Sequence, residues 1–304
     1  NNAKKGLKSL YLTTISESQL KMVRHLKEFK FFSDDYLGDR FIYGDLGTVL
    51  RKQGSDEALE YIIEKIKTHK PHILVIDSFK VIRDVFPDEQ TFKTFVFDLA
   101  ATLSIWEVTV FLVGEYREED LTRLSEFAIA DGIFYLYGQQ EKRFQKRYLR
   151  ILKLRGSDFD QGEHLFEITS EGIEVYPRMR PKEKELDYRI ETEKKDFGIL
   201  ELDKMLSGGL NKGTITIISG ATGTGKTLFA LQFLIEGAER GEKGLYISFE
   251  EPVSQLMNNA RALSENFEKH VKNEQIIAKF VSPVELDVDK HAFEIIDIVQ
   301  KYNI

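Results

Sequence analysis

The sequence predicts an α/β protein in which a mainly parallel sheet is covered by helices on both faces. Short runs of apolar and β-branched residues alternate with longer helical segments, as in HILVIDSF at 72–79 followed by TFKTFVFDLAATLSIWE at 91–107. Near residue 220, a glycine-rich loop joins one such run to a helix. Two stretches of the chain also resemble each other at an offset of about 235 residues, which indicates a pair of related domains rather than a solenoid.

Composition bounds the function. The chain has 304 residues, of which 42% are hydrophobic and 31% charged, with a net charge of −7. That length favours two domains, and no apolar run reaches the roughly twenty residues of a membrane span. The zero cysteines exclude disulfides and thiolate metal sites, and with the lack of an apolar signal region they favour a cytoplasmic protein. The acidic balance makes a nucleic-acid partner an unfavoured prediction, and the six histidines have no metal-ligand spacing.

The internal repeat predicts the domain organisation. KSLYLTTISESQL at 8–20 resembles KGLYISFEEPVSQL at 243–256, and ALEYIIEKIKTHKP at 58–71 resembles AFEIIDIVQKYNI at 292–304. The first copy starts too late to include a glycine-rich loop, and the second ends where its next strand should begin, so we expect two incomplete tandem domains. The predicted parts are a first domain without its loop segment at 1–176, a charged linker at 177–195, and the opening part of a second domain at 196–304.

The stretch TITIISGATGTGKTLFALQF at 214–233 fits the phosphate-binding pattern G-x-x-x-x-G-K-[ST]. Glycines let several backbone N–H groups turn toward one polyphosphate. Lys226 is expected to reach the β and γ phosphates of ATP, and the Thr227 hydroxyl to bind Mg²⁺. The alternative is a glycine-rich turn that binds nothing, but the predicted strand TITIIS before it and helix after it favour the site. The predicted nucleotide-binding residues are Gly220, Thr222, Gly223, Thr224, Gly225, Lys226 and Thr227.

Asp77 ends the apolar run HILVID and fits a Walker B aspartate, which holds the Mg²⁺ hydration shell. An ordinary buried strand that ends in an acid is the alternative. Farther on, VTVFLVGEY at 108–116 is expected to form another buried parallel strand. The segments 142–156 and 164–177 are expected to form antiparallel strands that close the domain.

The basic stretch 142–155 has three interpretations. Its Lys, Arg, Phe and Tyr residues suit a nucleic-acid groove, or an edge strand with solvated charges. The third is a pair of cations, Lys153 and Arg155, that share one strand face with Ile151 at period two. Such cations can reach the γ-phosphate held by a neighbouring subunit.

Two long segments carry a family resemblance. FGILELDKMLSGGLNKGTITIISGATGTGKTLFALQFLIEGAERGEKGLYISFEEP at 197–252 resembles the start of a KaiC-type, RecA-like P-loop ATPase domain, and ILKLRGSDFDQGEHLFEITSEGIEVYPR at 151–178 resembles its end. The resemblance implies a RecA-like fold, a hexameric ring formed by self-association, and ATP with Mg²⁺ bound between subunits. It further implies that Lys153 and Arg155 are the trans-acting cations and that Glu250 and Glu251 are paired catalytic acids.

The resemblance predicts an ATPase that hydrolyses MgATP to ADP and phosphate. A carboxylate near the γ-phosphate can orient the attacking water, although Glu250 and Glu251 also suit a charged turn before Pro252. In the first copy Ile15 and Ser16 stand at the acid positions, which argues against hydrolysis there. The alternative function is a nucleotide-gated assembly or signalling scaffold with little turnover. A Ser/Thr autokinase and a RecA-like DNA recombinase are further alternatives.

Overall fold

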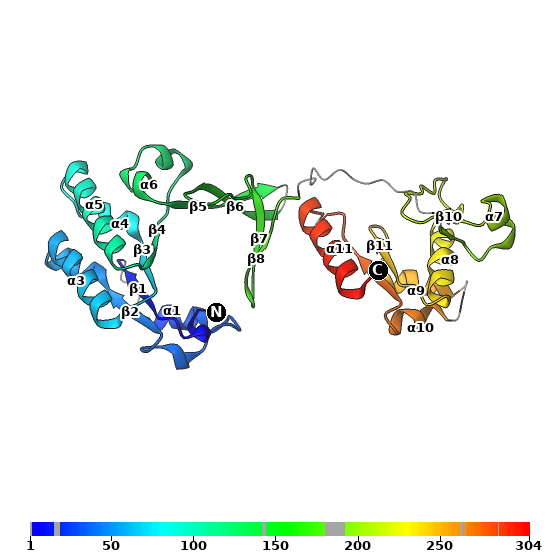
Figure 1. Ribbon diagram of the computed structural model, residues 1–304, viewed down its shortest axis with the longest axis horizontal. Coiled ribbons are helices and arrows are strands. Elements are labelled where there is room, and N and C mark those ends of the chain that lie inside the picture. Colours follow the sequence, from blue (N-terminus) through cyan, green and yellow to red (C-terminus); the bar gives the residue numbers. More distant parts are fainter. Residues whose placement is uncertain are drawn as a thin grey trace. The chain divides into compact units, whose positions relative to one another are not determined.

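The computed structural model describes residues 2–14, 19–141, 144–179, 192–261, 264, 266–284 and 286–304. The chain folds into two compact units, Asn1–Val175 and Tyr176–Ile304, which begin and end beside the domain boundary expected at residue 176 (Figure 1). The acid positions of the first copy, Ile15 and Ser16, lie outside the described residues, as does most of the expected linker.

The first unit is built on a parallel sheet with the strand order β2-β1-β3-β4. Its strands are β1 (Ser9–Thr13), β2 (Phe41–Asp45), β3 (Ile73–Asp77) and β4 (Thr109–Val113), each parallel to its neighbour. The predicted parallel sheet is therefore confirmed. The carboxyl end of β3 carries Asp77, opposite Thr13 of β1 and Val113 of β4.

Helices flank this sheet and bury its apolar side chains (Figure 1). They are α2 (Leu46–Lys52), α3 (Ser55–His69), α4 (Phe79–Arg83) and α5 (Glu89–Ile105). The unit also contains α1 (Gln19–Leu26), α6 (Ser125–Ile129) and the 3-10 turns η1 (Ala3–Lys5), η2 (Asp34–Tyr36) and η3 (Glu118–Thr122). The predicted helix near 91–107 is α5, which begins where the Asp88 side chain accepts a hydrogen bond from the Thr91 N–H at 2.8 Å. Its buried residues, Phe92, Phe95, Val96, Leu99 and Leu103, recur at helical spacing.

One expectation for this sheet is wrong. The sequence predicts that the strand at 108–116 is buried, but β4 lies at the end of the strand order, and Phe111 and Val113 are 48% and 42% exposed. An apolar run records only that a strand is hydrophobic, and an edge strand can carry the same residues as a central one.

The rest of the first unit is a second sheet with the order β5-β6-β7-β8. Its strands are β5 (Gly132–Glu141), β6 (Phe144–Leu154), β7 (His164–Thr169) and β8 (Gly172–Tyr176). β6 pairs antiparallel with β7, as predicted, and also with β5. His164 is buried, and its Nε2 lies 3.0 Å from the Asp160 carbonyl oxygen, so it has a structural role in this sheet.

The second unit contains a parallel pair of strands packed on helices. The elements are β9 (Lys194–Lys195), α7 (Leu200–Met205), β10 (Leu210–Asn211), α8 (Lys226–Glu239), β11 (Gly244–Ser248), α9 (Val253–Arg261), α10 (Phe267–Lys272), β12 (Ile276–Phe280) and α11 (Val288–Tyr302). β11 runs parallel to β12, and β9 runs antiparallel to β10. The apolar core contains Leu231, Ile235, Ala238, Leu256, Ala260, Phe267 and Ile276.

Two predictions fail in this unit. The expected linker reaches residue 195, but Lys194 and Lys195 already form β9, because their backbone pairs with Leu210 and Asn211 far along the chain. The expected strand TITIIS is also absent: 214–219 has no regular structure, and Ile215 and Ile217 are 94% and 85% exposed. Strand propensity alone does not order a segment that lacks a hydrogen-bonded neighbour and a surface to bury.

The two units share a strand arrangement. In the first, Ser9 of β1 lies opposite Phe41 of β2, and in the second, Gly244 of β11 lies opposite Ile276 of β12, both in parallel and at the same separation along the chain. Each pair is followed by a 15-residue helix, α3 or α11, that ends at a residue in the left-handed conformation. Among the described residues, no helix is both long and apolar enough to cross a membrane.

Candidate nucleotide-binding site

The glycine-rich loop has the backbone that its pattern predicts. Gly225 has a φ of +88°, a conformation that glycine adopts without strain, and it is the N-terminal cap residue of α8. A Cβ on Gly220 would lie 2.6 Å from the Thr224 hydroxyl, so a larger residue there would displace the Thr224 side chain that closes the loop. The Thr224 hydroxyl in turn donates to the Ala221 carbonyl oxygen at 2.8 Å. The loop is therefore a tight turn, and Thr222 and Gly223 are exposed at its tip.

Lys226 and Thr227 are the first two residues of α8, directly after the loop. The Lys226 ammonium donates to the carbonyl oxygens of Gly220 and Ala221, each at 2.9 Å, so it lies against the loop. No side chain of the cap residue occupies the helix N-terminus, and its first N–H groups and positive dipole end suit an anion. Main-chain amides, a lysine and a hydroxyl are the groups that a Mg²⁺-bound polyphosphate requires, and this loop brings all of them together.

The helix that carries these residues is fixed from the other side by Phe197. This side chain is only 3% exposed, and its ring centroid lies 4.7 Å from that of Phe229 and 4.9 Å from that of Phe233, both on α8. The Phe197 N–H also donates to the Asp203 carboxylate at 2.8 Å. The segment before α7 is thereby packed on the phosphate-binding helix.

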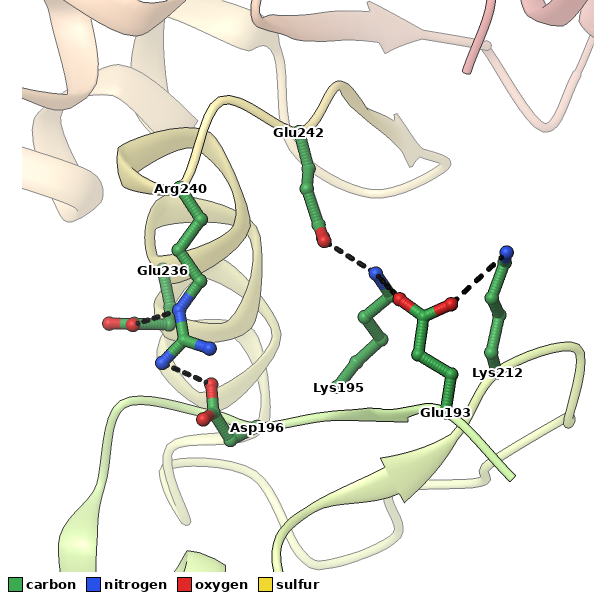
Figure 2. Close-up of polar contacts among 7 residues, drawn as sticks. All are labelled: Glu193, Lys195, Asp196, Lys212, Glu236, Arg240 and Glu242. Atoms are coloured by element: carbon green, nitrogen blue, oxygen red, sulfur yellow. Dashed lines mark hydrogen bonds and ion pairs between the residues drawn. The ribbon is translucent and has the colours of Figure 1, made fainter. Parts of the chain in front are cut away.

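A network of ion pairs surrounds the C-terminal end of α8 and adds to the contacts that Phe197 makes with this helix (Figure 2). Lys195 lies between Glu193 and Glu242, with N–O distances of 2.7 and 2.5 Å. Arg240 lies between Glu236 and Asp196, both at 2.7 Å. The hydrogen bonds to Glu193 and Glu242 raise the pKa of Lys195. A cavity of about 200 Å³ lies among these side chains, at the opposite end of α8 from Lys226, so it is not part of the candidate site.

The acid pair follows β11. Glu251 is held on two sides: its N–H donates to the Ser248 hydroxyl at 2.9 Å, and its carboxylate accepts from the Asn259 amide at 3.0 Å. The preceding Glu250 is exposed. A side chain that is fixed in this way keeps its carboxylate in place, as a group that orients a water molecule requires.

Tyr246 lies on β11, the strand that precedes the acid pair. Burial of its phenol raises the pKa of Tyr246, and a hydrogen bond with the Thr227 side chain opposes that rise. The negative charges of Glu251 and Glu250 raise the pKa further. Three of the predicted site residues, Thr227, Glu250 and Glu251, therefore influence the ionisation of this phenol.

The remaining predicted residues belong to the first unit. Asp77 ends β3, and its carboxylate accepts a hydrogen bond from the Tyr11 hydroxyl at 2.5 Å. The next residue, Ser78, is buried, and its N–H and carbonyl oxygen both bond to the Thr14 hydroxyl at 2.8 Å. The end of β3 is therefore held in one conformation by β1 and the residue that follows it.

Lys153 and Arg155 lie at the end of β6. The Lys153 ammonium contacts the carbonyl oxygens of Phe127 and Ala128 at 3.4 and 3.3 Å, and Arg155 pairs with Asp131 at 3.2 Å. The strict alternation expected from Ile151 onward is not kept, because the pairing with β5 shifts by one residue between Ile151 and Lys153, and β6 ends at Leu154. A β-bulge inserts an extra residue and turns the strand, yet both cations still reach the segment 127–131.

Sequence analysis missed three residues of these sites: Tyr11, Tyr246 and Asn259. The two tyrosines stand at the same place in the repeated segments KSLYLTT and KGLYISF, so a comparison of the repeat could have found them. Asn259 had no such signal, because its contact with Glu251 depends on the path of α9. Across the part of the chain that the structure describes, no cluster of three or more His, Cys, Asp or Glu residues could hold a metal ion by itself.

Comparison with known proteins gives a consistent result. The family model described as "ATPase: KaiC" matches residues 1–180 and 196–301. The circadian clock oscillator protein KaiC of Rippkaea orientalis is 33% identical over 219 residues, which is 70% of this chain and 40% of that protein. The circadian clock protein KaiC3 of a Synechocystis species is 29% identical over 275 residues, which is 87% of this chain and 52% of that protein. The chain thus spans about half the length of these relatives or less.

Proposed function

Because the chain belongs to the KaiC ATPase family, we propose that it binds MgATP through the loop Gly220–Thr227 and hydrolyses it to ADP and phosphate. One observation carries this proposal: the loop is closed at Gly220, turned at Gly225 and faced by the Lys226 ammonium at the N-terminus of α8. Backbone N–H groups from the loop and from the first turn of α8 bind the phosphates, and Lys226 exchanges its bonds to the loop carbonyls for phosphate oxygens.

The residues divide the chemistry between them. The Thr227 hydroxyl holds Mg²⁺, which when bound neutralises charge on the β and γ phosphates. Glu251, held by Asn259 and by its own N–H bond to Ser248, keeps a carboxylate at the end of β11 to orient the attacking water. Glu250 adds a second negative charge beside it. In the first unit, Asp77 at the end of β3 is proposed as the Walker B residue.

Lys153 and Arg155 are proposed to act on ATP held by another subunit of a ring, which we take to be a hexamer. Their contacts support this role, because Arg155 and Asp131 are exposed, at 58% and 82%, and such an ion pair contributes little stability in water. Exchanging Asp131 for a phosphate therefore costs little. We also propose two tandem KaiC domains, the first at 1–176 and the second at 196–304, joined through the charged segment that precedes β9.

The experiment compares the full-length protein with its Glu250→Gln and Glu251→Gln variants. We expect ATP binding to be unchanged and turnover to fall at least tenfold in one variant or both, because glutamine keeps the shape of the side chain but loses its charge. The fall should be larger for Glu251, the residue that Asn259 holds. Unchanged turnover in both variants and in the double variant would remove the acids from the mechanism.

A nucleotide-gated scaffold is the second candidate. The acid pair argues against it, because an assembly that only binds ATP has no use for a carboxylate that an amide holds in place. It predicts that ATP changes the oligomeric state measured by light scattering while phosphate release stays at background. DNA-stimulated turnover with a steep salt dependence would instead indicate a recombinase.

A further inference from the structure

The buried residue of the short helix α6 is an acid. Of the five residues Ser125–Ile129, Glu126 is the one that the unit buries, and only 4% of it is exposed. Burying a carboxylate is costly unless donors surround it, and an apolar side chain at this place would pack without that cost. A gain in stability alone therefore does not explain an acid here.

Two donors from neighbouring segments hold this carboxylate. An Arg83 guanidinium nitrogen lies 3.1 Å from one oxygen of Glu126, and the Tyr116 hydroxyl donates to the other at 3.2 Å. Arg83 is the last residue of α4, and it also pairs with Glu89, the first residue of α5, at 2.9 Å. Burial and the charge of Glu126 raise the pKa of Tyr116, so its hydroxyl remains a donor at neutral pH. The carboxylate thereby ties α6 to α4 and to the start of α5.

The C-terminal end of α6 and the residues after it hold the two cations of β6. The Lys153 ammonium donates to the carbonyl oxygens of Phe127 and Ala128 at 3.4 and 3.3 Å. Arg155 pairs with the Asp131 carboxylate at 3.2 Å, and its N–H donates to the Asp131 carbonyl oxygen at 2.8 Å. Carbonyl oxygens are neutral, so they fix the Lys153 ammonium while leaving its charge available to a phosphate. The position of both cations therefore follows that of this segment.

An isolated helix of five residues does not hold its own shape, so the conformation of α6 depends on its tertiary contacts, and Glu126 is its buried residue. We propose that Glu126 is a positioning residue for Lys153 and Arg155: it fixes α6, and α6 sets where the two cations lie. This inference rests on the proposed action of these cations on ATP held by another subunit.

A simpler interpretation treats the pair of Glu126 and Arg83 as part of the core alone. The two interpretations differ in how the protein distinguishes ATP from ADP. Cations that reach the γ-phosphate favour ATP, because ADP lacks that group. A positioning residue for them therefore changes the ratio of the two affinities, whereas a core pair changes folding stability and leaves that ratio alone.

The test measures the affinities of the full-length protein for N-methylanthraniloyl derivatives of ATP and of ADP with Mg²⁺ present. Glu126→Gln keeps the shape of the side chain and removes its charge. It should lower the ratio of ATP affinity to ADP affinity about three- to tenfold, the effect of one lost hydrogen bond. In a background that carries Lys153→Ala and Arg155→Ala, the same change should leave the ratio unaltered, because the effects of residues that act through one another do not add.

Two tyrosine variants support the comparison. Tyr116→Phe keeps the ring and removes the hydroxyl bond to Glu126, so it should lower the ratio in the same direction, and it carries the test if Glu126→Gln does not fold. Tyr148→Phe is the matched control. Tyr148 lies on β6, as Lys153 does, and its hydroxyl donates to Glu141 at 2.7 Å. This variant removes the same kind of bond and should keep the wild-type ratio.

The outcomes separate the claims. A wild-type ratio in both Glu126→Gln and Tyr116→Phe overturns the positioning role, even if the variants unfold more easily. An equal fall in the background without the two cations also overturns it, because Glu126 would then act elsewhere. If the variant that lacks both cations keeps the wild-type ratio, their action on ATP is wrong and the inference falls with it, while the proposed binding of MgATP stands. A wild-type protein that binds no ATP rejects the proposed function itself.

Discussion

Replacing Gly225 with alanine separates backbone geometry from side-chain chemistry at the phosphate-binding loop. Gly225 has a φ of +88°, and a Cβ at this position would have no atom within 4 Å. The substitution therefore causes no clash, and its cost is the strain of a left-handed conformation in an L-amino acid, about 1–2 kcal/mol. The same residue caps α8, the helix that begins with Lys226.

This strain can lower either the stability of the protein or its affinity for MgATP. If the loop keeps its shape, the free energy of unfolding falls by about 1–2 kcal/mol and the affinity for MgATP is retained. If the backbone rotates to relieve the strain, the N–H groups no longer converge on the phosphates, and an equal free energy appears as a loss of affinity of roughly five- to thirtyfold. We expect the second outcome, because residues 220–224 are exposed and the loop is held by hydrogen bonds of its own, which a backbone rotation can break.

The matched control is Gly213→Ala. Gly213 has a φ of +77° and also has no atom within 4 Å of a built Cβ, but it precedes the loop. Denaturant unfolding measures the stability of each variant, and nucleotide titration with Mg²⁺ measures affinity. The reasoning is refuted if Gly213→Ala weakens binding as much as Gly225→Ala, or if Gly225→Ala keeps both full stability and full affinity.

Two further predictions concern folding. Phe197→Ala should lower the free energy of unfolding of the second unit by about 3–5 kcal/mol in denaturant unfolding, because it leaves a cavity against α8. Phe280→Ala is the control, because its ring is 38% exposed and its loss should cost clearly less. Equal costs for the two variants would contradict the role of Phe197 in packing on α8. Asp45 caps α2 and accepts hydrogen bonds from the Thr48 N–H and hydroxyl at 2.9 and 2.6 Å. Burial opposes ionisation of Asp45, but these bonds and the charge of Arg51 outweigh it and hold its pKa below the ordinary value of 3.8. The charged form therefore stabilises the fold above about pH 4, and this contribution is lost as the pH falls through the lowered pKa. Asp45→Asn keeps a capping oxygen, so the stability difference between wild type and variant should shrink on acidification, and a difference that does not change with pH would show that the charge is irrelevant.

Local sequence patterns predicted those strands and helices that form because of residues within the element itself. The run that ends at Asp77 forms a strand with Leu74 and Ile76 fully buried, and the helix after the loop begins at Lys226. Both outcomes follow from apolar spacing and loop chemistry within about twenty residues. The loop itself was predictable for the same reason, because its glycines act on their own backbone.

Features that depend on distant neighbours were not predictable. The segment TITIIS has strand propensity, but a strand also needs a partner, and propensity does not supply one. The bulge at the end of β6 depends on pairing with β5, so the shared face assigned to Lys153 and Arg155 could not be checked from spacing alone. The bond between Asn259 and Glu251 joins two segments whose contact only the fold creates.

The outer strand β4 has a practical consequence. Its outer edge presents backbone groups and the exposed side chains Phe111 and Val113. A second exposed apolar segment contains Ile215 and Ile217. Backbone that is unpaired and flanked by apolar groups invites strand addition from any neighbouring molecule. This polypeptide should therefore aggregate as its concentration rises, and binding and activity are best measured on dilute samples.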